Sequence, residues 1–228
     1  MATWIIHLRI CDLLSGEAPL PLEAFAVGSV APDCGRQNED GLTYTPPKSV
    51  SHFSATGRSE SIDCRFFARD YLEKARTKRE FAFLCGYWCH LLTDKLWGET
   101  VFRPTERAYL ADFPDRQSFM RAVKRDWYDL DSLYLLGHPD FPAYRTLCGI
   151  ERFEGEYLPF YPAAVIDEKI REIRNYYERR EFDPKRTDYV YLTPERADRF
   201  VSTAARLCRE TLASIWGRNG FDGEFEAG

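Results

Sequence analysis

The sequence predicts an all-α protein, and three observations lead to that prediction. Apolar residues recur at helical spacing along most of the chain, most clearly in residues 79–99, where Phe83, Tyr87 and Trp97 lie on one face. Only one short segment, residues 189–192, resembles a strand. A hydrophobic content of 44% with 29% charged residues is typical of a folded chain with an ordinary soluble surface. We therefore expect a single domain of about six to eight helices over residues 1–228.

Local signals place the boundaries of these helices. Pro32 ends a second apolar helix, and residues 33–50, which are rich in Gly, Asn, Asp and Pro, predict a loop. The last helix has a clear start, because Thr193 can cap it and Pro194 suits its first position. In chain order, helices are expected over residues 4–15, 21–31, 61–78, 79–99, 115–136, 163–180 and from 194 to about 215.

Charge and hydropathy exclude several classes of protein. The chain has 31 Lys and Arg against 36 Asp and Glu, a net charge of -5, whereas a protein held to nucleic acid through phosphates carries a positive excess. We therefore expect no stable nucleic-acid complex. We also expect no transmembrane segment, because no stretch approaches about eighteen uninterrupted apolar residues.

The N-terminus and the cysteines indicate a compartment. His7 and Arg9 interrupt the first apolar run, and no basic leader precedes it, so the N-terminus does not resemble a signal peptide. Seven cysteines with no CxxC pair favour reduced, mostly buried thiols over a disulfide framework. Both observations predict a cytoplasmic protein.

Several polar residues fall where a plain hydrophobic core is expected. His7 shares a helical face with Ile10 and Leu14, so it points inward if that helix packs on its apolar side. His90 and Asp94 are four residues apart on the most apolar helix and therefore lie on one face. A buried carboxylate is costly unless a cation or several donors meet it, so a positive group should lie near Asp94.

Two explanations of these residues compete. In the first, Asp94 pairs with His90 or an arginine, and His7 is a satisfied core histidine. In the second they are metal ligands, because imidazole and carboxylate one turn apart can hold one ion from the same side. Asp33 and His52 favour the second explanation, since both follow prolines in stiff loops, and rigid loops commonly supply metal ligands. Gly86, one turn before His90, leaves room for another element to approach.

Four motifs in order resemble a known family. They are His7 in an N-terminal helix, the segment GSVAPD ending at Asp33, SHF around His52, and GYWCHLLTD from Gly86 to Asp94. Together they look like the bacterial zinc-dependent phospholipase C family, which is similar to the single-strand-specific zinc nucleases. The resemblance covers roughly the first hundred residues.

The resemblance implies an all-α fold that holds zinc. By that likeness Asp33, His52, His90 and Asp94 would ligate one metal, and Asp94 would bridge to a second metal held by His7. Two ions so bridged sit about 4 Å apart and can share a hydroxide that attacks phosphorus. The implied activity is hydrolysis of phosphate esters, as a phosphodiesterase or a phospholipase C-like enzyme. Asp94, the bridge, and Asp33, which can orient or deprotonate the water, are the catalytic candidates.

The chain also departs from the family pattern. Secreted members use the amino group of an N-terminal Trp as a ligand, whereas Trp4 is internal here. The family's third zinc site needs two further histidines and a carboxylate, and only His138 remains after the HxxxD helix. One or two zinc ions are therefore expected, and manganese or iron would suit the same donors. Asp126 and His138 are second-tier replacement ligands, although an ion-paired Asp126 and a loop His138 are the simpler interpretations.

The sequence thus favours a zinc-dependent hydrolase that acts on a small phosphate ester or a phospholipid headgroup. One alternative is a metal-stabilised binding or regulatory protein with a degenerate, inactive site. Another is a metal-free helical interaction protein in which His90 and Asp94 satisfy each other. Lys48 and Arg103 are basic residues that could meet a phosphate, but among 31 basic residues the sequence gives them little weight.

Overall fold

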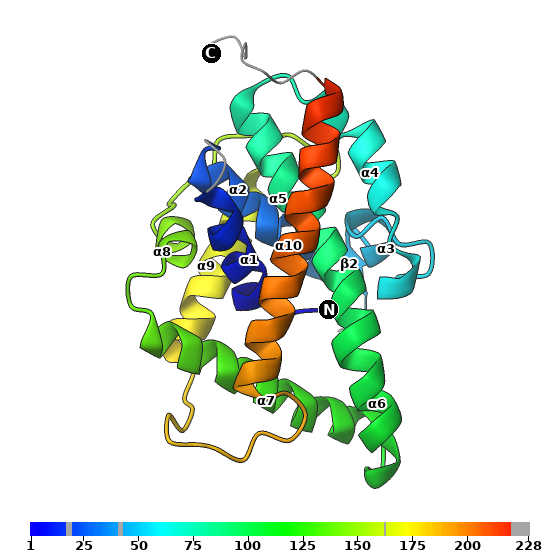
Figure 1. The fold of residues 1–228 in the computed structure, drawn as a ribbon, viewed down its shortest axis with the longest axis vertical. Helices are drawn as coiled ribbons and strands as arrows, with labels where there is room; N and C mark the ends of the chain where they lie inside the picture. Colours follow the sequence, from blue (N-terminus) through cyan, green and yellow to red (C-terminus); the bar gives the residue numbers. More distant parts are fainter. Residues whose placement is uncertain (17–19, 41–42, 162, 220–228) are drawn as a thin grey trace.

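The computed structural model of the chain describes residues 1–16, 20–40, 43–161 and 163–219. It is an all-α fold in which long helices surround the N-terminal segment, and the N-terminus lies in the middle of the molecule (Figure 1). In chain order the helices are α1 (Trp4–Ser15), α2 (Leu22–Val30), α3 (Lys48–Ser51), α4 (Cys64–Asp70), α5 (Lys78–Trp97), α6 (Arg103–Tyr109), α7 (Arg116–Gly137), α8 (Pro142–Cys148), α9 (Ala163–Arg179) and α10 (Pro194–Asn219).

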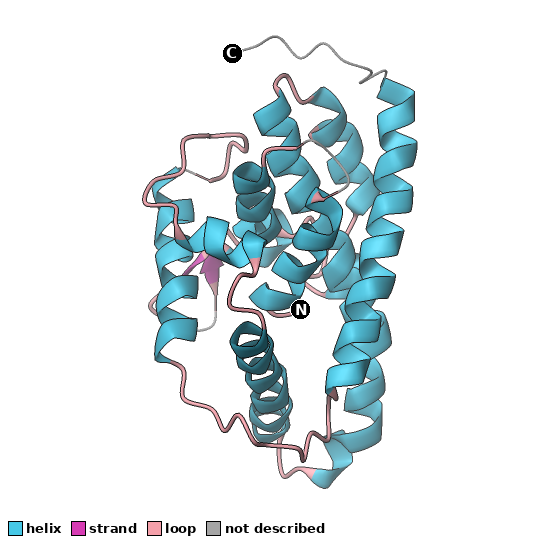
Figure 2. Ribbon diagram, turned by 60° about the vertical axis from the view of Figure 1, so that its left-hand side comes forward, coloured by secondary structure: helices cyan, strands magenta, loops and turns pink. Residues whose placement is uncertain are grey.

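Short elements connect these helices. A 3-10 turn, η1 (Ala31–Asp33), extends α2, and a π-helical turn, η4 (Gly98–Phe102), joins α5 to α6. Further 3-10 turns are η2 (Ser59–Ser61), η3 (Leu72–Lys74) and η5 (Leu110–Asp112). The strands β1 (Arg36–Gln37) and β2 (Tyr44–Thr45) form a two-residue antiparallel pair that faces the helices (Figure 2).

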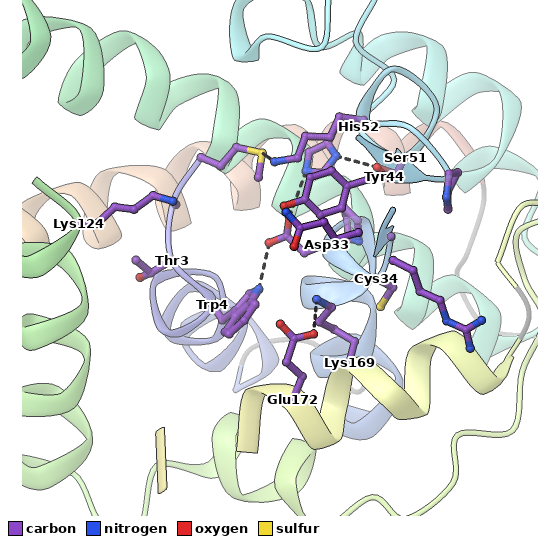
Figure 3. A pocket seen from close by; sticks show the side chains of 18 of the residues that line it. Thr3, Trp4, Asp33, Cys34, Tyr44, Ser51, His52, Lys124, Lys169 and Glu172 are labelled. Atoms are coloured by element: carbon purple, nitrogen blue, oxygen red, sulfur yellow. Dashed lines mark hydrogen bonds and ion pairs between the residues drawn. The ribbon is translucent and has the colours of Figure 1, made fainter. Parts of the chain in front are cut away.

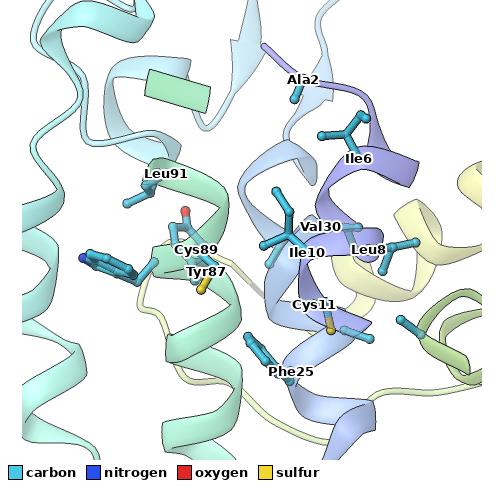
Figure 4. Packing of buried hydrophobic residues seen from close by; sticks show 14 of the residues in the cluster. Ala2, Ile6, Leu8, Ile10, Cys11, Phe25, Val30, Tyr87, Cys89 and Leu91 are labelled. Atoms are coloured by element: carbon cyan, nitrogen blue, oxygen red, sulfur yellow. The ribbon is translucent and has the colours of Figure 1, made fainter. Parts of the chain in front are cut away.

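The core lies where α1, α2 and α5 meet. Ile10 and Cys11 of α1 face Val30 and Phe25 of α2, and all four are almost completely buried (Figure 4). Fully burying one such side chain stabilises the fold by about 1.5 to 3 kcal/mol. The helix α10 packs along α1 and α5, and α8 covers the other side of α1 and α2. The site residues are therefore held by the most buried helices of the fold.

Two glycines allow α2 and α5 to come unusually close. A Cβ atom on Gly28 would overlap the carbonyl oxygen of Phe83, and one on Gly86 would overlap the carbonyl oxygen of Phe25. Backbone contacts this short are possible only without side chains at both positions. The expectation that Gly86 makes room for another element is thus confirmed, and that element is α2.

Most predicted helices are present, and the differences have local causes. The predicted helix over residues 61–78 is shorter in the structure, because Asp63 caps α4 through bonds from the amides of Arg65 and Phe66. Thr77 then caps α5 by accepting from the Glu80 amide, so a new helix starts there. The helices α6 and α8 were not predicted, since seven residues are too few for a periodic apolar pattern.

The predicted strand is wrong. Residues 189–192 form no strand, because the amides of Val190 and Tyr191 donate to the carboxylate of Asp126, at 3.0 and 2.7 Å. The observed strand pair lies instead inside the predicted loop over residues 33–50, of which residues 41 and 42 are outside the described part of the chain.

Two other expectations concern the whole chain. All seven cysteines are free, and five of them are buried, as predicted. Among the described residues, no helix combines the length and the apolar character that a membrane crossing needs.

Candidate metal centre

The helix α5 supplies two of the predicted ligands from one face. His90 and Asp94 lie one turn apart near its C-terminal end, and both are almost completely buried. The Nε2 atom of His90 is 3.5 Å from Oδ2 of Asp94. This distance is too long for a good hydrogen bond, so the pair does not satisfy itself.

The close approach of α2 orients the ring of His90. Because Gly28 and Gly86 let the backbones meet, the carbonyl oxygen of Ser29 accepts a 2.9 Å hydrogen bond from Nδ1 of His90. In the neutral form of this ring the proton is held on Nδ1, so the lone pair on Nε2 points toward Asp94. A hydrogen bond from the far ring nitrogen to a backbone carbonyl is the usual partner of a metal-bound histidine.

His52 is fixed by the turn that ends α3. Its Nδ1 atom shares a 2.9 Å hydrogen bond with Oγ of Ser51, and the hydroxyl of Tyr87 donates to the Ser51 carbonyl. Phe53 follows in the left-handed region, with φ of 48°, which is strained for a bulky residue. Its ring packs on Phe67, with centroids 5.0 Å apart, and this packing holds the turn.

His7 enters the site from α1 without a hydrogen bond on either ring nitrogen. Its ring stacks on the ring of His90 with centroids 3.8 Å apart and an angle of 8° between planes. Its Nε2 atom lies 3.5 Å from Oδ1 of Asp94, whereas His90 lies near the other carboxylate oxygen, Oδ2. Oδ1 also accepts a 2.7 Å hydrogen bond from the backbone amide of Ala2.

Asp33 closes the site at the end of η1. Its Oδ1 atom is 3.5 Å from Nε2 of His52, and its Oδ2 atom accepts a 3.0 Å hydrogen bond from the indole of Trp4. The side chain of Asp33 is 14% exposed, whereas those of His52 and Asp94 are at most 3% exposed. Asp33 is therefore the ligand candidate that faces the outside.

These donor atoms fit a metal ion better than they fit one another. Buried atoms without a hydrogen-bond partner include Nε2 of His7, His52 and His90 and Oδ2 of Asp94. The Nε2-to-carboxylate distances are 3.5 to 3.6 Å. Ligand atoms about 2.0 to 2.1 Å from one tetrahedral zinc ion are themselves roughly 3.4 Å apart. The orphaned atoms and their spacing thus match a zinc site.

Among the described residues there are two overlapping groups of donors whose ligand atoms all lie within 4.8 Å of one another. One contains His7, His90 and Asp94, and the other contains Asp33, His52 and His90. The two oxygens of Asp94 face both sides, since Oδ1 lies near His7 and Oδ2 near His52 and His90. This arrangement suits one ion, or two ions with Asp94 between them.

Burial and mutual charge prepare the donors for a cation. Burial lowers the pKa of His7 to about 4, and burial also lowers the pKa of His52, so both rings are neutral near pH 7. For Asp33 and Asp94, burial alone would raise the pKa, but the neighbouring histidines lower it below the usual value. The neutral rings of His7 and His52 and the ionised carboxylates are in the protonation states that metal binding requires. For His90, burial would lower the pKa, but Asp94 and Asp33 raise it above the usual value, so a metal ion competes there with a proton.

The structure does not bring the second-tier candidates to this cluster. Asp126 is buried, but its carboxylate accepts from Arg186 at 2.5 Å and from two backbone amides, so its oxygens are already bonded. His138 is exposed, and its ring stacks on Tyr134 while Nδ1 donates to the Tyr134 carbonyl. The ion-paired Asp126 and the loop His138 are therefore the correct interpretations.

A cavity of about 840 Å³ opens on the metal cluster. Asp33, His52 and Trp4 line its inner wall, and Lys169, which pairs with Glu172, lies opposite on α9 (Figure 3). The volume is in the range of small-molecule sites. A small ligand can therefore reach Asp33 and His52 without unfolding of the chain.

Sequence reasoning missed three groups that position the ligands. They are the indole of Trp4 on Asp33, the carbonyl of Ser29 on His90, and the amide of Ala2 on Asp94. Two of the three are backbone groups, which carry no residue-specific signal. The indole of Trp4 could have been considered, because an indole N–H that is partly removed from water usually finds a hydrogen-bond acceptor.

The fold and the site define an all-α protein with a buried centre of histidines and aspartates that is suited to a divalent metal. Residues 4–97 match the family described as zinc dependent phospholipase C. The matched segment contains all five predicted ligands, and the helices from α6 onward lie outside it. Neither the curated proteins nor the solved structures include a significant match.

The match confirms the resemblance that the four motifs indicated. Together with the donor groups it supports zinc as the cofactor and a zinc hydrolase as the general class. A family of phospholipases C also indicates a lipid or another phosphate ester as the type of substrate.

Proposed function

We propose that this protein is a zinc-dependent phosphodiesterase, with an activity like that of a phospholipase C. One observation carries the proposal: five buried or nearly buried donor residues from four elements converge, with unsatisfied nitrogen and oxygen atoms, and two of them, Asp33 and His52, line a substrate-sized cavity. A core that only needed stability would satisfy or omit such groups.

Each donor has a distinct part in this proposal. His52 and His90, which lie near Oδ2 of Asp94, and His7, which lies near Oδ1, would hold the metal together with Asp94. Zinc, when bound, supplies a Lewis acid that activates water and neutralises charge on the phosphoryl oxygens. Asp94 stays ionised and buried, so its charge would help to hold the cation among the three imidazoles.

Asp33 is the candidate for handling the proton of the attacking water. It is the carboxylate of the cluster that borders the cavity, and the indole of Trp4 donates to one of its oxygens. The other oxygen, Oδ1, lies 3.5 Å from Nε2 of His52, and the side chain is 14% exposed. Asp33 can therefore orient a water molecule toward a bound phosphate and accept its proton.

A second candidate function is metal-stabilised binding without turnover. Asp126 and His138 are held by other partners, so the described residues provide no replacement there for the family's third zinc site. This observation favours a centre that binds a phosphate ester but does not hydrolyse it. Turnover distinguishes the two functions.

The experiment measures zinc content and hydrolysis of bis(p-nitrophenyl) phosphate together. We expect the zinc-loaded wild type to hydrolyse the diester and the His90→Ala variant to lose both zinc and activity. His138→Ala is the matched control, because it removes an exposed histidine outside the cluster. Zinc binding without turnover would select the binding protein, and a wild type that binds no transition metal would refute both functions.

A further inference from the structure

The cavity beside the metal cluster is more basic than the chain as a whole. Five basic residues line it against three acidic ones, although the full chain carries a net charge of -5. The acidic residues are Asp33, Glu168 and Glu172. The basic ones are Arg36, Lys48, Arg116, Lys124 and Lys169.

Three of the basic side chains are already neutralised by carboxylates. Arg36 makes a bidentate pair with Glu168, at 2.7 and 2.5 Å. Lys169 pairs with Glu172 at 2.6 Å. Arg116 pairs with Glu106, which lies outside the cavity lining. These pairs fix the shape of the wall and leave little charge for a ligand.

Lys48 and Lys124 differ, because neither pairs with a carboxylate among the described residues. The Nζ atom of Lys48 lies 3.3 Å from the sulfur of Met1 and 5.4 Å from the centre of the Tyr44 ring. Lys124 extends from α7 toward the N-terminal segment at the edge of the cavity (Figure 3). Two cations on separate elements thus border one cavity without a counter-charge of their own.

The electrostatics of Lys124 agree with this geometry. Lys124 is an exposed residue, but the surrounding chain partly shields its ammonium group from water, which lowers its pKa. The charge of Lys48 lowers the pKa further, while Asp33 has the opposite effect. The charges of Lys48 and of Asp33, the outermost candidate ligand of the metal cluster, therefore both act on Lys124. Like charges placed near each other are unfavourable unless an anion comes between them.

The position of Lys48 ties it to the cluster. It begins α3, one helical turn before His52, and both residues line the cavity. Solvated lysines on a surface helix would be the simplest interpretation of either residue alone. Their shared cavity, which also contains Asp33 and His52, is the reason to assign them a ligand.

We propose that Lys48 and Lys124 form an anion subsite that binds the phosphate oxygens of the substrate beside Asp33 and His52. The inference rests on the proposed function, because it assigns to the same site the residues that position an anionic substrate. Charge-assisted hydrogen bonds from two ammonium groups would hold the phosphate while the metal centre contacts its other oxygens.

The test measures binding of inorganic phosphate to the zinc-loaded protein by calorimetry, with the zinc content recorded for each variant. We expect Lys48→Met and Lys124→Met each to raise the dissociation constant about tenfold, as expected for the loss of one charge-assisted hydrogen bond. Arginine at either position should restore most of the binding, and the zinc content should not change. Hydrolysis of bis(p-nitrophenyl) phosphate should show a raised KM with a smaller change in kcat.

Lys78→Met is the matched control. Lys78 is exposed at the first position of α5, twelve residues and therefore about 18 Å along the helix from His90. If the two cavity variants bind phosphate as Lys78→Met does, the subsite is refuted while the hydrolase remains. If the wild type binds phosphate through these lysines but hydrolyses no diester, the subsite stands and the hydrolase fails.

A second substrate distinguishes a lipid headgroup from phosphate alone. A water-soluble short-chain glycerophospholipid carries the same diester within a larger molecule. An equal loss for this lipid and for bis(p-nitrophenyl) phosphate identifies the phosphate as the group that Lys48 and Lys124 bind. A loss with only one of the two substrates would contradict the proposal.

Discussion

The rings of His7 and His90 stack in parallel with their centroids 3.8 Å apart, although the two residues are 83 positions apart in the sequence. Two cationic imidazoles would repel each other in this geometry, and the charge of His90 contributes, after burial, to the lowered pKa of His7. The stack therefore requires a neutral His7. Its Nε2 lone pair, next to Oδ1 of Asp94, is then available to a metal ion.

The first prediction concerns this histidine. We expect His7→Ala to bind less zinc than the wild type, because Asp94 Oδ1 would lose its imidazole neighbour on that side. Metal analysis after dialysis against a weak chelator measures the loss. Full zinc content in a folded His7→Ala protein would show that the ions are held by His52, His90 and the aspartates alone.

A second prediction concerns the contact between α2 and α5. Gly86→Ala places a Cβ atom against the Phe25 carbonyl, which is backbone and cannot rotate away. We expect the variant to lose about 1 to 3 kcal/mol of unfolding free energy. The shift of α2 should also move the Ser29 carbonyl from His90 and weaken zinc binding.

Gly137→Ala is the control for this substitution. Gly137 ends α7, and a Cβ atom there would have no atom within 4 Å. Denaturant unfolding of both variants separates the clash from the general effect of replacing glycine. Equal stability of Gly86→Ala and Gly137→Ala would contradict the close approach of the helices.

A third prediction uses a buried carboxyl outside the metal cluster. Asp131 accepts hydrogen bonds from Thr3 and Tyr177, at 2.7 and 2.6 Å, yet burial raises its pKa from 3.8 to about 7. A raised folded-state pKa means that the folded protein binds this proton more tightly than the unfolded chain. The stability from Asp131 is thus present below about pH 4 and is lost as the pH rises toward 7.

Unfolding measured from pH 4 to 7 tests this assignment. The difference in unfolding free energy between wild type and Asp131→Asn should decline as the pH rises, because the amide has no proton to lose. The expected decline is on the order of a few kcal/mol. A pH-independent difference would show that Asp131 has the same protonation in the folded and unfolded states.

Local patterns in the sequence determined much of the fold. The apolar periodicity of α5 and α7 predicted both helices within a few residues, because a long helix repeats its pattern several times. The short helix α8 was not predicted, because seven residues are too few to show a helical repeat of apolar positions. Residues 189–192 resemble a strand by residue type, but they form none, because two of their backbone amides donate to Asp126 and not to a neighbouring strand.

The sequence also determined which residues are chemically unusual, but not how they meet. His7 and Asp94 stood out by themselves, since imidazole and carboxylate on apolar helix faces are costly without partners. Only the tertiary structure decided that Asp126 pairs with Arg186 while Asp33 stays near His52. The same holds for Lys48 and Lys124, which pair with no carboxylate in the part of the chain that the structure describes, because the partners of a charged side chain depend on distant segments that folding brings together.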